Sequence, residues 1–381
     1  MTDAPTDAAR PRAQASAPPP FPFFGLAPWA IAVPLLGVAS LLVGKPSGLV
    51  LVTGLALLLG AVVMAAVYHA EILAHFLGEP FGTLVLAFAV TVIETSLIVS
   101  IMLGDAAGEG SGGSQALARD TLIAAIMITI NGIVGICLLA GGRRHHEQSY
   151  TQSGVSVGLA MLATLAVTTL VLPNYTTSAS GAFYNPTQLA FAAVISLIVY
   201  GTFVVAQTIR HSDHFLHPEE DDHAHEAPVT REKAVAAAIA LVPALVAVVL
   251  LAKALSPSIE AGVAAVGAPK AMVGIIIAAL VLAPEGFAAY RAARANRVQT
   301  SLNLAIGSAL ATIGLTIPAV AVTALVLGLD LELGLSMRST VLLALTLLVA
   351  SLTLGTGRTT VVQGVIHLVI FATWLFTTLV P

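Results

Sequence analysis

The chain has 381 residues, of which 57% are hydrophobic and 9% are charged, with a formal net charge of −4. Soluble domains carry about 25% charged residues, so this chain lacks the polar groups that a water-facing surface needs. The composition therefore argues against a soluble enzyme, a nucleic-acid binder or a disordered chain, and predicts an integral membrane protein.

Residues 1–27 are rich in Ala, Pro and Ser and predict a disordered cytoplasmic tail. After this tail, eleven stretches are apolar enough for a lipid-crossing helix, which needs roughly 20 residues. We expect the first and the tenth to be short. The predicted spans are 29–44, 48–69, 79–103, 117–140, 154–172, 187–209, 232–252, 266–289, 301–327, 337–354 and 358–379.

The Lys and Arg residues predict how these spans are oriented. With the N-terminus in the cytoplasm, eleven of the 16 basic residues fall on the cytoplasmic side and five fall outside. Cytoplasmic loops normally carry the excess of Lys and Arg. The sequence therefore predicts a protein of the inner (plasma) membrane with a cytoplasmic N-terminus and an external C-terminus.

Two glutamates lie well inside predicted spans, where burying a carboxylate costs at least roughly 2.5–3.5 kcal/mol. Glu94 is in the middle of the third span, and Glu285 is in the second half of the eighth. Acids at such positions are rare and usually functional, so both are candidate ligands for cations and protons. A structural hydrogen-bonding role is the alternative for either residue taken alone.

The surroundings of the two glutamates indicate an internal repeat. Each acid follows an apolar helix and precedes a span that is rich in small and hydroxyl residues. Aligning Thr121 with Thr300 also superposes Gly135 on Gly314. Five helices are an odd number, so the two copies enter the membrane in opposite directions, as in many secondary transporters.

The predicted fold class is thus an all-α polytopic membrane protein with about 11 transmembrane helices. It consists of one leading helix and two inverted five-helix repeats. The expected parts are the tail 1–27, a leading helix at 28–46, a first repeat at 47–210, an acidic and His-rich cytoplasmic linker at 211–231 and a second repeat at 232–381.

Inverted copies would place the two glutamates on opposite sides of a pseudo-two-fold axis, where they can face each other. Carboxylates, hydroxyls and backbone carbonyls form an all-oxygen site, which suits hard cations such as calcium. Pro284 removes an amide donor and predicts an interruption of the helix beside Glu285. Thr91 shares a helix face with Glu94 and could direct its hydroxyl to the same ion.

The same carboxylates suit the exchange of cations for protons. Without a cation, two neighbouring carboxylates in a low dielectric repel each other and take up protons as a coupled pair. A divalent cation competes for the same oxygens and displaces these protons. We therefore expect antiport of calcium, sodium or potassium against protons, with no ATP site and no cofactor.

Four further residues are candidates for supporting roles. Asn131, Ser308 and Thr312 could line the site, although the packing of small residues between helices explains them nearly as well. Glu79, in the sequence GEPFG, is either an acid at the entrance of the site or a cap at the start of a helix.

Two segments carry a resemblance to a known family: GEPFGTLVLAFAVTVIETSLI at 78–98 and PEGFAAYRAARANRVQTSLNLAIGSALATIGLTIP at 284–318. They resemble the cation/calcium antiporter superfamily, specifically its calcium/proton exchanger branch. Within that branch, the sequence is most similar to the bacterial ChaA-type sodium (potassium)/calcium–proton antiporters. The resemblance extends over roughly 48–379, with one extra leading helix.

The resemblance implies an inverted repeat in which Glu94 and Glu285 bind the cation and the proton, with Asn131 and Ser308 lining the site. Plant and yeast exchangers of this branch carry an Asn beside each acid and a Gln on the ninth helix. In this chain those places are occupied by Ile93, Pro284 and Ala311. Fewer neutral oxygen ligands leave room for sodium or potassium as the transported ion.

Residues 211–226, HSDHFLHPEEDDHAHE, hold five of the ten His and six of the twenty acidic residues. Clustered His and carboxylates can bind metals, so one interpretation is a cytoplasmic segment that collects cations. The interpretation that we favour is a solvated linker between the repeats.

The leading hypothesis is a secondary antiporter that exports a cytoplasmic cation, most simply calcium, in exchange for protons. A sodium or potassium/proton antiporter with the same residues is the close alternative. A cation channel is less well supported, because a selectivity ring normally needs oligomeric symmetry around a pore. A membrane enzyme is not expected, since the spans contain no Asp pair, HExxH or nucleophile constellation. The expected partners are inorganic cations, protons and membrane lipid.

Overall fold

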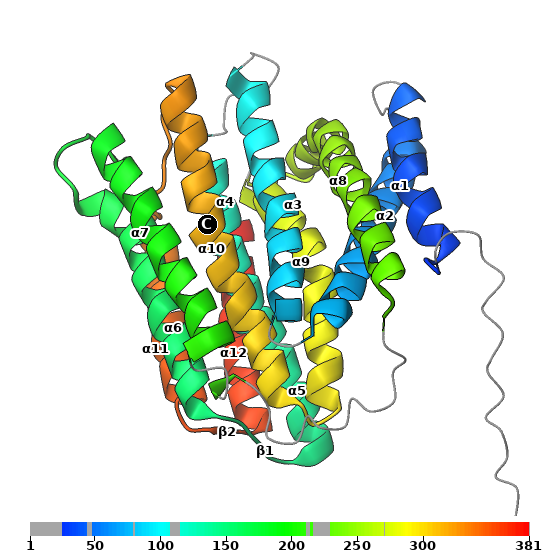
Figure 1. Ribbon diagram of the computed structural model, residues 1–381. Coiled ribbons are helices and arrows are strands. Elements are labelled where there is room, and N and C mark those ends of the chain that lie inside the picture. The colour runs from blue at the N-terminus through cyan, green and yellow to red at the C-terminus, as the bar shows by residue number, and fades with distance from the viewer. Residues whose placement is uncertain are drawn as a thin grey trace, which may run out of the picture.

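The computed structural model describes residues 25–43, 48–78, 81–106, 115–210, 214–215, 229–269 and 271–380. These ranges form a helical bundle with one two-stranded sheet (Figure 1). The first seven helices are α1 Pro28–Ser40, α2 Leu49–Leu77, α3 Phe81–Ala106, α4 Leu117–Ile126, α5 Val134–His145, α6 Gln152–Ala166 and α7 Pro186–Val205. They are followed by α8 Arg231–Ala265, α9 Ala271–Arg294, α10 Val298–Leu327, α11 Met337–Leu354 and α12 Val361–Leu379.

Short turns of non-α helix extend or join these helices. The 3₁₀ turns are η1 (Leu41–Val43) and η4 (Leu172–Tyr175). The π turns are η2 (Met127–Ile133), η3 (Val167–Val171) and η5 (Ala206–Arg210). Because η2 joins α4 to α5 without a break, the described residues form eleven helical segments, the number that the sequence predicts.

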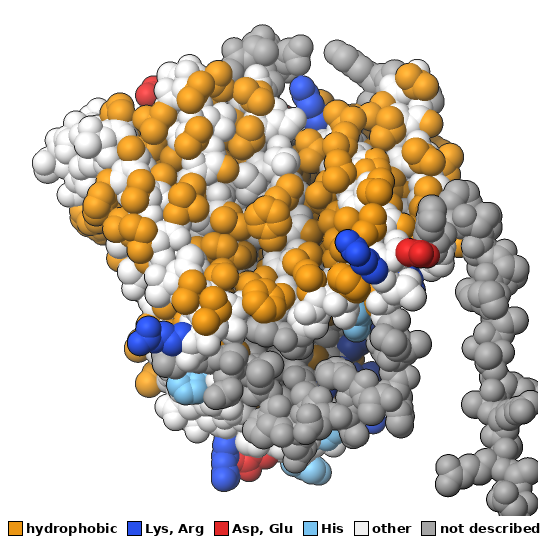
Figure 2. Space-filling model, in the orientation of Figure 1, with side chains coloured by type: hydrophobic (Ala, Val, Ile, Leu, Met, Phe, Trp, Pro, Cys, Tyr) orange, Lys and Arg blue, Asp and Glu red, His pale blue; other side chains and the backbone are white. Residues whose placement is uncertain are grey.

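Nine helical segments of the described ranges are long and apolar enough to cross a membrane. The two remaining segments are α1 and α3, whose apolar parts are shorter, at Pro28–Ser40 and Ala87–Ser100. Figure 2 shows the corresponding surface, a broad hydrophobic face with most of its charged side chains near the margins. An α-helix satisfies its backbone hydrogen bonds internally and can therefore lie in lipid. With nine such apolar helices among its described residues, this is an integral membrane protein.

The predicted ends of two spans are wrong. α2 continues to Leu77 instead of ending at 69, and α8 continues to Ala265 instead of ending at 252. Charged residues such as Lys253 mark the end of an apolar stretch, but they do not stop a helix. α2 instead stops directly before Gly78, and α8 stops two residues before Gly267. Both glycines have a positive φ, which a right-handed helix cannot continue.

The two repeats interlock instead of forming separate halves. Among the described helices, α2 packs against α8, α3 packs against α10, and α4 packs against α9. The last helix of each repeat also packs on the other repeat, since α7 contacts α10 and α12 contacts α5. The contact of α3 with α10 corresponds to that of α9 with α4, and the contact of α7 with α10 corresponds to that of α12 with α5. Two inverted copies around a two-fold axis require such corresponding contacts.

Two glycines that the internal alignment superposes make equivalent contacts. A Cβ atom on Gly135 would lie 2.9 Å from Cγ of Leu368 on α12. A Cβ atom on Gly314 would lie 2.6 Å from Cβ of Tyr200 on α7. In both cases a small residue lets the last helix of the opposite repeat approach closely, as is common between membrane helices.

A short sheet fastens one end of the bundle. β1 (Gln148–Ser149) follows α5 and pairs antiparallel with β2 (Arg358–Thr359), which follows α11, with Gln148 opposite Thr359. Nε2 of Gln148 also donates a hydrogen bond of 2.9 Å to the backbone oxygen of Ala293. The sheet and this bond link the ends of α5, α9 and α11.

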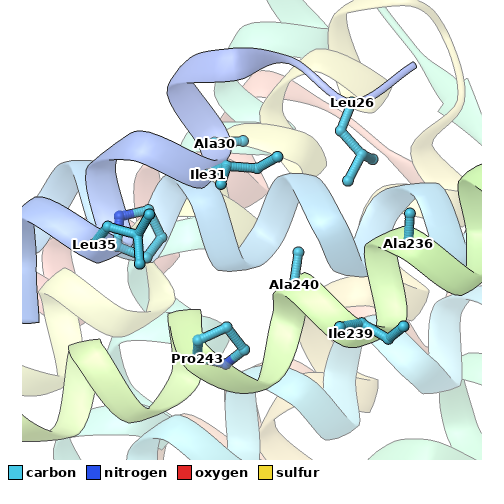
Figure 3. Close-up of a pocket in the computed structure, with 9 residues that line it drawn as sticks. Leu26, Ala30, Ile31, Leu35, Ala236, Ile239, Ala240 and Pro243 are labelled. Carbon is cyan, nitrogen blue, oxygen red and sulfur yellow. The ribbon is translucent and has the colours of Figure 1, made fainter. Parts of the chain in front are cut away.

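An apolar groove lies between α1 and α8 at the edge of the bundle (Figure 3). Its volume is about 300 Å³. The lining residues are Leu26, Ala30, Ile31, Pro34, Leu35, Ala236, Ile239, Ala240 and Pro243. Since none of these side chains is polar, the groove offers no ligand for an ion and belongs to the apolar outer surface.

We predict that Gly314→Ala destabilises the protein by about 1–3 kcal/mol, because the new methyl group overlaps Tyr200. Gly201→Ala on α7 is the matched control, since a Cβ atom at Gly201 meets nothing within 4 Å. The difference in stability is measured by heating both variants in detergent and recording the fraction of protein that stays monodisperse. Equal melting temperatures would contradict the close contact between α7 and α10.

Candidate cation site

Glu94 and Glu285 are both buried in the interior of the bundle. Glu94 on α3 has an exposed fraction of 0%, and Glu285 on α9 has an exposed fraction of 5%. Buried apolar side chains such as Ile93 and Leu282 flank them along their helices. A carboxylate in such surroundings is unfavourable unless it is hydrogen-bonded, paired with a cation or protonated.

Two hydroxyl groups of α10 contact the two carboxylates. Oγ1 of Thr312 donates a hydrogen bond of 2.7 Å to Oε2 of Glu94. Oγ of Ser308 donates to Oε2 of Glu285. Residues four apart on a helix lie about 5–6 Å from each other on one face. α10 therefore brings the acids of the two repeats to neighbouring positions.

One oxygen of Glu94 remains available for a ligand. Its Oε1 atom is buried and has no hydrogen-bond partner. Within the described ranges it is the only buried carboxylate oxygen in this condition. A buried acceptor without a partner costs about 1–3 kcal/mol, so the geometry favours a proton or a cation at this atom.

A further hydroxyl contact lies one helical turn away. Oγ1 of Thr95 and Oγ1 of Thr316 are 2.8 Å apart. Thr95 directly follows Glu94, and Thr316 follows Thr312 by four residues. Sequence reasoning missed this pair, although the spacing of Ser308, Thr312 and Thr316 by four residues already places three hydroxyls on one face of α10.

The structure does not join Thr91 or Asn131 to either acid by a hydrogen bond. Thr91 is buried on α3, and its hydroxyl donates to the backbone oxygen of Ala87 at 2.8 Å. Asn131 is fully buried in η2. Its Nδ2 donates to Oγ1 of Thr346 at 2.8 Å, and its Oδ1 lies 3.1 Å from Nδ1 of His367. The site roles of Thr91 and Asn131 therefore stay predictions.

Asn131 is the centre of a second buried polar cluster. Nε2 of His367 on α12 lies 2.9 Å from Oγ1 of Thr353 on α11, so the cluster links η2 of the first repeat to two helices of the second. A π turn adds a residue to one helical turn and is frequent at functional sites. His367 is thus a fully buried histidine with a hydrogen-bond partner at each ring nitrogen.

Two sequence-based candidates fall outside the described residues. These are Glu79 and the segment 211–226, of which only 214–215 are described. In the part of the chain that the structure describes, no group of three or more His, Cys, Asp or Glu residues is arranged to hold a metal ion. The candidate site therefore consists of two carboxylates and neighbouring hydroxyls.

The predicted interruption at Pro284 is wrong, since α9 is continuous from Ala271 to Arg294. Proline removes one backbone donor, and membrane helices tolerate this loss because neighbouring groups compensate for it. Gly286, the residue after Glu285, packs closely against a neighbouring helical segment. A Cβ atom there would lie 3.1 Å from Cδ1 of Ile133 in η2.

A small cavity adjoins Glu285 and extends toward the end of the bundle where α10 begins. Its volume is about 20 Å³, which is enough for a single water molecule. The polar and aromatic residues that line it are Glu285, Ser308, Tyr200, Phe203, Gln207 and Asn303. Of the two acids, only Glu285 lines this cavity, and polar side chains lie between it and one end of the bundle.

Inverted repeats with buried acids at their interface are an architecture of secondary transporters. The comparison with protein families gives the class. The chain belongs to the sodium/calcium exchanger protein family, which matches residues 47–209 and 236–380. This family agrees with the resemblance to the cation/calcium antiporter superfamily, and the calcium/proton exchanger branch stays a prediction.

Individual relatives agree with this class. The chain is 45% identical to the putative ionic transporter y4hA of Sinorhizobium fredii, over 93% of this chain and 96% of the relative. It is 37% identical to the sodium-potassium/proton antiporter ChaA of Escherichia coli, over 82% of this chain and 84% of the relative. A solved H⁺/Ca²⁺ exchanger, CAX, has the same fold, with a TM-score of 0.70 and 16% identity over 91% of this chain and 86% of that one. The chain is thus a member of a family of cation antiporters.

We predict that Thr312→Val weakens the apparent cation affinity about tenfold or more. Glu94 then loses a hydrogen bond to a charged group, which is worth about 1.5–3 kcal/mol. Thr312→Ser is the control, because it keeps the hydroxyl. Cation-dependent proton flux in everted vesicles gives the apparent KM of each variant. Equal KM values for the Val and Ser variants would contradict this role of the hydroxyl.

Proposed function

We propose that this protein is a secondary antiporter that exports a cation, calcium in the first instance, in exchange for protons. The proposed site consists of Glu94 and Glu285. The observation that carries the proposal is that hydroxyls on one face of α10 hold two buried carboxylates from inverted repeats close together. Membership of a cation antiporter family supports the transport class.

The two carboxylates supply the charge and part of the ligand set for a divalent cation. Two negative charges are balanced by one Ca²⁺ or by two protons. Oε1 of Glu94 is free to coordinate an ion. The hydroxyls of Ser308 and Thr312 donate to the acids and still carry lone pairs, so they can accept an ion as well. All of these ligands are oxygen atoms, as calcium requires.

Exclusive occupancy couples the two flows. Two buried carboxylates this close cannot both stay ionised without a counter-ion, so protons replace a cation when it leaves. A returning cation displaces the protons from the same oxygens. Rocking of one repeat against the other would then expose the site to each side of the membrane in turn.

The proposed orientation has the N-terminus in the cytoplasm and the C-terminus outside. α10 then begins at the cytoplasmic side, and the small cavity beside Glu285 extends in that direction. Protons that enter the cell down their gradient at the plasma membrane would drive the export of the cation.

Sodium or potassium/proton antiport at the same site is the second candidate. A relative with 37% identity is a sodium-potassium/proton antiporter. In addition, the carboxamide of Asn131 is bonded to Thr346 and His367, so it adds no ligand in this conformation. Calcium takes 6–8 oxygen ligands, and a smaller set of protein ligands lowers the preference for it.

We predict that Glu94→Gln and Glu285→Gln each reduce cation/proton exchange to background. One remaining carboxylate cannot balance a divalent cation, and the amide cannot carry a proton across. Glu71→Gln on α2 is the matched control, since Glu71 is partly exposed and distant in sequence from both acids. Dissipation of a preset pH gradient in everted vesicles after the cation is added, read with a pH-sensitive dye, measures the exchange. Normal flux in either Gln variant would remove that residue from the mechanism.

We predict that calcium dissipates the preset pH gradient at lower concentrations than sodium or potassium. The reason is that one divalent ion satisfies both carboxylates. The three cations are titrated separately in the same vesicles, with vesicles that contain the Glu285→Gln variant as the blank. A response to sodium or potassium without one to calcium would establish the second candidate instead.

A further inference from the structure

Two residues of the connection between the repeats, His214 and Phe215, are fixed against the end of the bundle. The side chain of Phe215 has an exposed fraction of 8%. Its ring packs edge-on against Phe203 of α7, with the centroids 5.8 Å apart and an angle of 88° between the planes. Its backbone oxygen accepts a hydrogen bond of 2.5 Å from Nδ2 of Asn303 on α10.

The binding position for Phe215 is built by the two repeats together. The backbone N–H of Thr151 donates to Oε1 of Gln299 at 2.7 Å, and Nε2 of Gln299 donates to Oδ1 of Asn303 at 3.0 Å. Both ends of the Asn303 carboxamide are therefore engaged, and its NH₂ group is directed to Phe215. This chain of bonds runs from the start of α6 through one face of α10.

Gly154 on α6 makes room for the backbone of the same segment. A Cβ atom at this position would overlap the backbone oxygen of His214. Any larger residue would therefore push the segment away from the bundle. The ring contact, the hydrogen bond and this close approach are three independent features that hold Phe215 in one place.

The residues that contact Phe215 also line the cavity beside Glu285. Phe203 and Asn303 border that cavity together with Glu285 and Ser308. Phe215 contacts both of these lining residues, although it does not line the cavity itself.

We propose that Phe215 is a plug that closes the path from this end of the bundle to the cavity at Glu285. An ion can enter from this end only when Phe215 leaves its contacts with Phe203 and Asn303. The proposal rests on the proposed role of Glu285 in transport. In this proposal the connection between the repeats joins the two halves of the chain, and its residue Phe215 also controls access to the cavity at Glu285.

The accessibility of the cavity tests the plug without any transport measurement. Gly307→Cys places a thiol in the cavity, and a Cβ atom there meets nothing within 4 Å. Cys137, the one native cysteine, is replaced by Ala in all variants. A charged methanethiosulfonate reagent then labels the full-length protein in nanodiscs. Adding Phe215→Ala is expected to increase the labelling rate about tenfold, since loss of the ring contact leaves the path open.

Two further variants separate the plug from a general loosening of the protein. Phe76→Ala removes an exposed phenyl ring at the end of α2 and should label at the parent rate. Gly154→Ala retains Phe215 but displaces His214, so it should label as fast as Phe215→Ala. If Phe215→Ala folds poorly, Phe215→Leu tests the same ring contact with a smaller loss of apolar area.

Labelling of folded Phe215→Ala (or Phe215→Leu) and Gly154→Ala at the parent rate would overturn the plug. Fast labelling of Phe76→Ala would do the same, because it would show that the cavity opens for unrelated reasons. The readout does not depend on exchange. Normal exchange in Glu285→Gln would therefore contradict the proposed function. The labelling rates would still show whether Phe215 closes the path to the cavity.

Discussion

Two carboxylates buried side by side in an apolar bundle are the constraint on which the rest of this structure depends. The ion pairs in the described part of the chain involve Arg119 and Arg358, near the ends of helices, and none of them includes Glu94 or Glu285. Hydroxyl groups offset only part of the desolvation of two acids. In the proposed mechanism the remaining counter-charge comes from solution, as a metal cation or as protons, which are the ions that an antiporter carries.

α10 makes this arrangement possible, and it does so asymmetrically. Ser308 donates to Glu285, which belongs to the same repeat, and Thr312 donates to Glu94, which belongs to the other. The counterpart of Ser308 in the first repeat is Thr129, whose hydroxyl donates to the backbone of its own helix at Ala125. The scaffold is therefore close to two-fold symmetric, while the hydroxyl ligands come from one of the two equivalent helices.

The sequence was sufficient to predict the fold class and the neighbourhood of the two acids. An isolated Glu in a long apolar run is visible in one dimension, because burying a charge is so unfavourable that it needs a reason. Spacing by four residues likewise predicts that Ser308 and Thr312 share a helix face. These signals are local, and they do not depend on knowing which helices touch.

The features that could not be predicted depend on backbone irregularity or on distant contacts. Asn131 lies in a π turn, which shifts side chains around the helix axis relative to the regular spacing that sequence reasoning assumes. The position of Phe215 requires Phe203, Asn303 and Gly154 to meet, and no sequence period relates these residues. The acidic and His-rich composition around Phe215 favours a solvated linker and conceals the one aromatic residue that is buried.

The modest ligand set of the candidate site is compatible with the transport role that we propose for it. A resident metal is normally held by several charged ligands with a fixed geometry, and the described residues show no such group. Here two acids bring the charge and hydroxyls bring weak neutral oxygens. The carboxamide of Asn131 is bonded to His367 and Thr346. An ion held mainly by charge is released once protons neutralise that charge. The same feature that makes binding weak therefore makes it reversible, and reversibility on each side of the membrane is what exchange requires.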